Sequence, residues 1–80
     1  MRIEERVKSI LWELSGEEDI ENETTLQEDL AMDSLSMVSL LIEIEEIFEI
    51  ELNESDMNPF ALRTVQNVID LVEKYTGEET

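Results

Sequence analysis

Few side chains in this sequence can do chemistry, and Ser34 is the best placed of them. The chain has no His and no Cys, which excludes a Ser-His-Asp triad, a cysteine nucleophile, a disulfide and a zinc site of Cys/His type. Ser34 follows Asp33 at the expected start of a helix, where unpaired N–H groups and the helix dipole would stabilise a phosphate on the serine. Asp33 could cap the helix or help to hold a metal ion. Taken alone, the Asp-Ser-Leu tripeptide is more typical of a simple helix cap.

The helix that should follow, at about 34–49, carries two apolar stripes. One stripe must face the core, and it contains Met37, Leu40, Leu41, Ile44, Ile47 and Phe48. The second stripe shares its side of the helix with three carboxylates, and this side contains Leu35, Val38, Ile42, Glu45, Glu46 and Glu49. A helix packed against one core has no internal use for a second stripe. Either the helix is buried on two sides, or it exposes an apolar partner-docking surface rimmed by acidic residues, and we favour the second interpretation.

The rest of the chain predicts an all-α fold, a small bundle of three main helices plus a short helix, in a single domain over residues 1–80. We expect helices at about 2–15 and 64–76, a long loop at 16–33, and an acidic tail at 77–80. The connection at 50–63 should hold one short helical turn, near 55–57 or near 59–61. A loop as long as 16–33 is usually functional. Its apolar residues should pack beneath it, and these are Ile20, Leu26, Leu30 and Met32.

The charge limits the possible partners. The 80 residues include 5 basic and 22 acidic side chains, a net charge of −17, and no basic residue lies between Ser9 and Leu62. Nucleic acid and anionic membranes both need a basic footprint, so neither is expected. No apolar run approaches the ~20 residues of a membrane span and no signal peptide is visible, which favours a soluble cytoplasmic protein. The acidic surface either is simply solvated or docks basic partners.

Three runs of residues in order resemble the acyl carrier protein and thiolation-domain family. They are Thr25-Leu26-x-x-Asp29-Leu30-x-x-Asp33-Ser34-Leu35-x-x-Val38, then Leu40-Leu41-x-x-Ile44-Glu45-Glu46-x-Phe48, and last Thr64-Val65-x-x-Val68-Ile69-x-Leu71-Val72. The resemblance implies that a phosphopantetheinyl transferase attaches 4′-phosphopantetheine to Ser34, flanked by Asp33 and Leu35. The cofactor's thiol would carry acyl or aminoacyl groups as thioesters.

The same resemblance implies a carrier that is not itself an enzyme and acts as a monomer. Its other partners would be a loading ligase and downstream synthase enzymes with basic docking surfaces. Exposed docking positions of the family match Leu35, Val38, Ile42, Glu45 and Glu46.

Two departures bear on the pathway. Carriers of bacterial fatty acid synthesis usually read Gly-Ala-Asp-Ser-Leu-Asp-x-Val-Glu, whereas this chain has Ser36 and Ser39 at the two later acidic positions. The run after Phe48 is also slightly longer, and the stretch 58–65 looks more like carriers of specialised pathways. These features favour a polyketide, peptide or D-alanyl type of carrier over housekeeping fatty acid synthesis.

The alternative from another class is an acidic interaction or divalent-cation-binding module without a covalent cofactor. Asp19, Glu21 and Glu23 begin like an EF-hand loop, but Thr24 stands at the glycine position and Leu30 at the final glutamate position. No specific metal site is therefore expected, although clustered carboxylates could bind divalent cations loosely. No pair of carboxylates or hydroxyls is placed as a catalytic pair would be.

Overall fold

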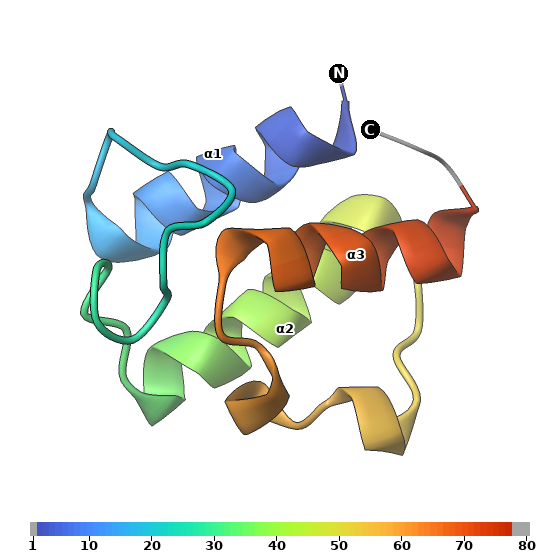
Figure 1. Cartoon of the computed structure of the whole chain (residues 1–80). Helices are drawn as coiled ribbons and strands as arrows, with labels where there is room; N and C mark the ends of the chain where they lie inside the picture. The colour runs from blue at the N-terminus through green and yellow to red at the C-terminus, as the bar shows by residue number, and fades with distance from the viewer. Residues whose placement is uncertain (1, 78–80) are drawn as a thin grey trace.

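The computed structural model describes residues 2–77 and shows three α-helices in a small bundle (Figure 1). They are α1 (Ile3–Ser15), α2 (Ser34–Phe48) and α3 (Val65–Thr76). The connection between α2 and α3 holds two short 3-10 helices, η1 (Glu54–Asp56) and η2 (Pro59–Ala61), so both of the expected alternatives form. The predicted all-α bundle with a long loop between the first two helices is confirmed. The part of the expected acidic tail that follows Gly77 lies outside the described residues.

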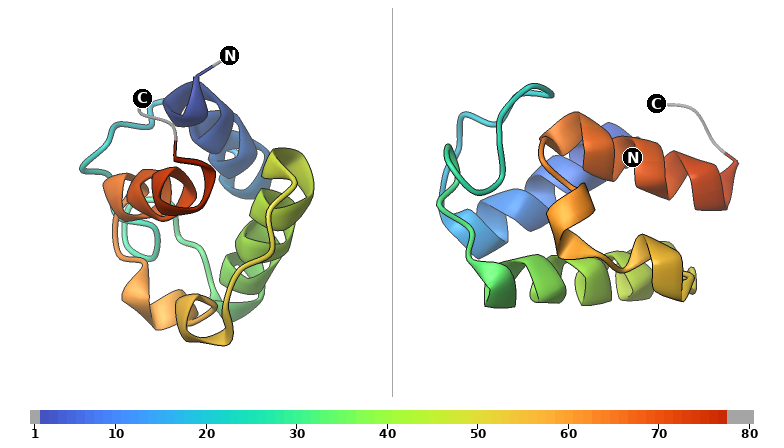
Figure 2. Two further views of the ribbon diagram at one scale, coloured as in Figure 1. Left: turned by 90° about the vertical axis from the view of Figure 1, so that its right-hand side faces the viewer. Right: turned by 60° about the horizontal axis from the view of Figure 1, so that its bottom comes forward.

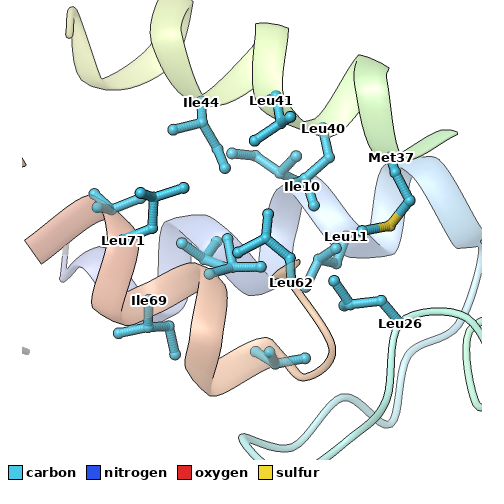
Figure 3. Packing of buried hydrophobic residues seen from close by; sticks show 14 of the residues in the cluster. Ile10, Leu11, Leu26, Met37, Leu40, Leu41, Ile44, Leu62, Ile69 and Leu71 are labelled. Atoms are coloured by element: carbon cyan, nitrogen blue, oxygen red, sulfur yellow. The ribbon is translucent and has the colours of Figure 1, made fainter. Parts of the chain in front are cut away.

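Buried apolar side chains from all three helices and from the long loop form one core (Figure 3). The inner stripe of α2 contributes Met37, Leu40, Leu41 and Ile44, each at most 1% exposed, while Ile47 and Phe48 are partly buried against the core. The loop residues Ile20, Leu26, Leu30 and Met32 are also buried, as their apolar character predicted. Within residues 2–77 the buried set contains no polar or charged side chain, so hydrophobic burial is the main favourable term that holds the bundle together.

Backbone hydrogen bonds tie the long loop to the start of α3. Leu26 N–H donates to the Arg63 carbonyl at 2.9 Å, and the Leu26 carbonyl accepts from Met32 N–H at 3.0 Å. Val65 N–H donates to the Thr24 carbonyl at 3.0 Å. Figure 2 shows the loop folded back along the bundle beside the chain that enters α3. These hydrogen bonds therefore fix the position of the residues just before α2.

No helix within residues 2–77 is both long enough and apolar enough to cross a membrane.

Ala31, in the turn that leads into α2, has a backbone φ of 52°. This left-handed region costs an L-residue other than glycine roughly 1 kcal/mol or more, because the Cβ crowds the following carbonyl. Ala31→Gly removes that cost, and the greater chain entropy of glycine in the unfolded state offsets part of the gain. We predict a net increase in the free energy of unfolding of about 0.5 kcal/mol, measured by urea denaturation.

Ala61 is the matched control, because it is the other alanine of the chain and its φ is not positive. Ala61→Gly should lower the free energy of unfolding by about 0.5–1 kcal/mol. If both substitutions lower stability by similar amounts, Ala31 is not strained.

Candidate functional site

Ser34 is the first residue of α2, and its side chain is exposed. Within residues 2–77 its hydroxyl makes no hydrogen bond. The Asp33 carboxylate caps this helix start, and no further acidic residue lies in the first turn of α2, so the remaining N–H groups of that turn can still favour an anion. A free hydroxyl at such a point can carry an anionic group that the helix itself stabilises.

Asp33 caps α2. Its Oδ1 accepts the Ser36 N–H at 2.8 Å, and its carbonyl accepts the Met37 N–H at 3.0 Å. The bond from the Ser36 backbone lowers the pKa of the Asp33 carboxyl below its ordinary value of 3.8, because hydrogen bonds to the ionised form favour that form. The structure thus gives Asp33 the capping role. Among the described residues, no group of three or more acidic side chains is placed to hold a metal ion.

The second apolar stripe of α2 lies on the surface. Leu35 is 76% exposed, Val38 45% and Ile42 47%, and we call these three residues the outer strip. Glu46 and Glu49 are exposed on the same side of the helix, toward its C-terminal end. The interpretation of α2 as buried on one side and open on the other is therefore correct, and Ser34 stands at one end of the open face.

Glu45 differs from the other carboxylates that were expected on this face. It is half-buried, and its Oε2 accepts the Leu52 N–H at 2.9 Å. Its backbone carbonyl also accepts the N–H groups of Glu49 and Ile50. Glu45 therefore stabilises the backbone at the point where the chain leaves α2, and its carboxylate also adds negative charge there.

A pocket of about 110 Å³, which we call the side pocket, opens between the long loop and the η2–α3 link. Its lining residues are Thr25, Gln27, Glu28, Phe60, Leu62 and Arg63. Reasoning from the sequence quoted Thr25 in a family motif and singled out the stretch 58–65, but it did not predict that these residues line a pocket. The available signal was that Arg63 is the single basic residue between Lys8 and Lys74.

A family model described as a phosphopantetheine attachment site matches residues 5–72. The matched span contains α2, the loop before it and most of α3. The geometry at Ser34 fits the chemistry of such a group, because a phosphodiester needs an accessible hydroxyl and gains from a helix N-terminus.

The Asp33 cap predicts a pH dependence. Because the folded pKa is lowered, the stabilising contribution is complete above the ordinary value of 3.8 and is lost as the pH falls through the folded value. Asp33→Asn keeps a good capping side chain but removes the titration. Denaturation curves at several pH values give the difference in free energy of unfolding between the unaltered protein and Asp33→Asn. This difference should become smaller as the pH falls below 3.8. A difference that stays constant on acidification would show that Asp33 titrates alike in the folded and unfolded states.

Proposed function

Because the chain belongs to the phosphopantetheine attachment-site family, we propose that Ser34 is the residue that carries its 4′-phosphopantetheine. Members of this family hold that group covalently on a serine and are carriers, not catalysts. The chain is therefore a phosphopantetheine carrier protein. Its partners include a phosphopantetheinyl transferase and the synthase enzymes that use the loaded carrier.

The choice of Ser34 is supported by comparison with the other serines. Ser15 Oγ donates to the Leu11 carbonyl at 2.7 Å, while Ser36 and Ser39 are half-buried inside α2. Ser9 and Ser55 are exposed, but Ser9 lies in the middle of α1 and Ser55 in the three-residue η1. Ser34 combines exposure with the first position of a long helix, which is the observation that carries this assignment.

The carrier itself needs few reactive side chains for this chemistry. In the modification, the transferase would accept the proton of the Ser34 hydroxyl, and the Ser34 oxygen would bond to the phosphorus that bears the pantetheine. The pyrophosphate bond of coenzyme A would break, and its nucleotide portion would leave. The attached group supplies the thiol for thioester formation, which a chain without Cys cannot supply. Asp33 holds the helix start and Ser34 in place, while partner enzymes provide catalysis.

We further propose that partners dock on the outer strip and on the acidic end of the same face. The strip offers apolar area for the centre of an interface, and Glu46 and Glu49 offer charge for a basic rim. Glu45 belongs to this surface by position, but its bond to Leu52 means that its substitution also disturbs the fold. The half of α2 next to Ser34 carries Ser36 and Ser39 where fatty acid carriers have carboxylates, which supports a carrier of a specialised polyketide, peptide or D-alanyl pathway.

Modification of Ser34 can be tested with coenzyme A and a broad-specificity phosphopantetheinyl transferase. Intact-mass spectrometry should show one added phosphopantetheine, and Ser34→Ala should abolish the addition. Ser36→Ala is the matched control and should be modified normally, because its backbone N–H, which bonds to Asp33, is unchanged. Modification that survives Ser34→Ala would place the site elsewhere.

The holo-protein from that experiment also separates the pathways. Charging by an adenylating acyl or amino acid ligase would agree with a specialised carrier. Charging by the malonyl transferase of fatty acid synthesis, with no ligase able to act, would contradict it.

Docking can be tested with two isoleucines of the same helix. Ile44 is fully buried, so Ile44→Ala should cost about 2–5 kcal/mol of stability. Ile42 is 47% exposed, so Ile42→Ala should change stability by only about 0.5 kcal/mol. The rate of modification by the transferase, measured on folded protein, should nevertheless fall for Ile42→Ala. If Ile42→Ala is modified at the rate of the unaltered protein, the outer strip is not the docking surface for that enzyme.

A further inference from the structure

Arg63 is an exposed cation whose charge has no partner in the described part of the chain. The hydrogen bonds of Arg63 within residues 2–77 come from its backbone, which donates to Asn67 Oδ1 at 3.0 Å and accepts from Leu26 N–H at 2.9 Å. Its guanidinium takes part in neither the ion pairs nor the ring contacts of those residues. Glu28 lines the same side pocket and still forms no ion pair with it. In a chain with 22 acidic residues, such an arginine is unusual.

The charge of Arg63 also acts against the helix that follows it. Arg63 directly precedes Thr64, the N-cap of α3, and the first turn of α3 contains no acidic residue. A cation at a helix N-terminus is unfavourable, because the helix dipole already places partial positive charge there. The charge of Arg63 therefore does not stabilise the fold. A charged group that breaks such a local rule is a candidate for a contact with another molecule.

Phe60 gives the same surface an apolar side chain. It lies on η2, is 71% exposed, and lines the side pocket together with Arg63. Burial of so large an exposed ring against a partner would be favourable. Aromatic side chains and arginine are enriched in protein interfaces relative to the rest of the surface. Phe60 and Arg63 thus combine the two residue types that are typical of a contact with another protein.

The hydrogen bonds of the long loop place Arg63 near Ser34. The Arg63 carbonyl is bonded to Leu26 N–H, and the Leu26 carbonyl is bonded to Met32 N–H at 3.0 Å. Ser34 follows Met32 by two residues, so the Ser34 backbone is at most about 17 Å from the Arg63 carbonyl. A standard interface of roughly 800 Å² per partner is about 32 Å across. An enzyme centred on Ser34 therefore covers Arg63 as well, and η2 contacts α2 on the way (Figure 2).

We propose that the phosphopantetheinyl transferase places a carboxylate against Arg63 and an apolar side chain against Phe60 while it acts on Ser34, an inference that rests on the proposed function. A carboxylate fits because the planar guanidinium binds both of its oxygens through parallel N–H···O bonds. Glu46 and Glu49, at the other end of α2, present the opposite charge. The transferase then meets a negative site and a positive site on two sides of Ser34, and this pairing fixes its orientation over the serine.

The sign of the charge effect separates this contact from a general attraction. A transferase that is basic over its whole docking surface would be attracted by the net charge of −17. Arg63→Glu makes the carrier more negative, so such an enzyme would modify it equally fast or faster. A carboxylate opposite residue 63 would instead meet a like charge, and association would be slower.

The test measures kcat/KM for the carrier with coenzyme A and the transferase that modifies the unaltered protein fastest. Arg63→Gln should lower kcat/KM about 2–5-fold and Arg63→Glu about tenfold, through a higher KM for the carrier. The loss should shrink as sodium chloride is added. Arg2→Glu is the matched control and should not lower the rate, because Arg2 is also an exposed arginine without an ion pair among the described residues but precedes α1, away from the start of α2 (Figure 1).

Stability shows whether a slower reaction reflects the interface or the fold. Because residue 63 lies beside the positive end of α3, urea denaturation should find Arg63→Gln at least as stable as the unaltered protein. If Arg63→Glu does not fold, Phe60→Ala takes its place, with Trp12→Ala as its control. Both remove an exposed aromatic ring, and only Phe60→Ala should slow the modification. Equal rates for these two variants would overturn the proposal.

The remaining outcomes separate the proposal from the proposed function. If Arg63→Glu is modified as fast as the unaltered protein or faster, no carboxylate faces Arg63 and the proposal is wrong. If the variant raises the KM for coenzyme A and not the KM for the carrier, Arg63 meets the phosphates of coenzyme A, which also overturns it. A failure of every transferase to modify the unaltered protein at Ser34 would instead refute the proposed function.

Discussion

The pairing of Leu26 with Arg63 and Met32 is the interaction on which the arrangement of the site depends. Leu26 is fully buried, its N–H is bonded to the Arg63 carbonyl, and its carbonyl is bonded to the Met32 N–H. A loop of this length pays an entropy cost for closure that buried side chains and hydrogen bonds must offset. Leu26 thus links the residue that precedes the N-cap of α3 to the segment of the loop that leads into α2. This link holds the start of α2 in a defined place.

The many acidic side chains of this protein lie on its surface and not in its core. Within the described residues all charged side chains are at least partly exposed, so the core is purely apolar. Some carboxylates serve the backbone: Asp29 accepts the Thr25 N–H at 2.9 Å, which lowers the pKa of its carboxyl. Asp33 does the same at the start of α2. The other carboxylates on α2 give this face of the protein a negative potential.

The spacing of apolar residues predicted the features that depend on local sequence. The helices, the two stripes of α2, the burial of the loop's apolar residues and the position of Ser34 at a helix start all follow from spacing and helix-start chemistry. Spacing does not show which distant residues meet. It therefore missed the bond from Leu52 to Glu45, the bond from the Tyr75 hydroxyl to Asp56, and the pocket that Phe60 and Arg63 line. Each of these is a contact between separate segments, fixed only when the bundle closes.

The long loop is a fixed part of the fold that places Ser34, and hydrogen exchange tests this most directly. Measured residue by residue in the folded protein, the amides of Leu26, Met32 and Val65 should exchange only as fast as the core amide of Leu41, through global unfolding. The unbonded amides of Glu18 and Asp19 should exchange much faster. Exchange of Leu26 and Met32 at the rate of Glu18, while Leu41 stays protected, would contradict the account.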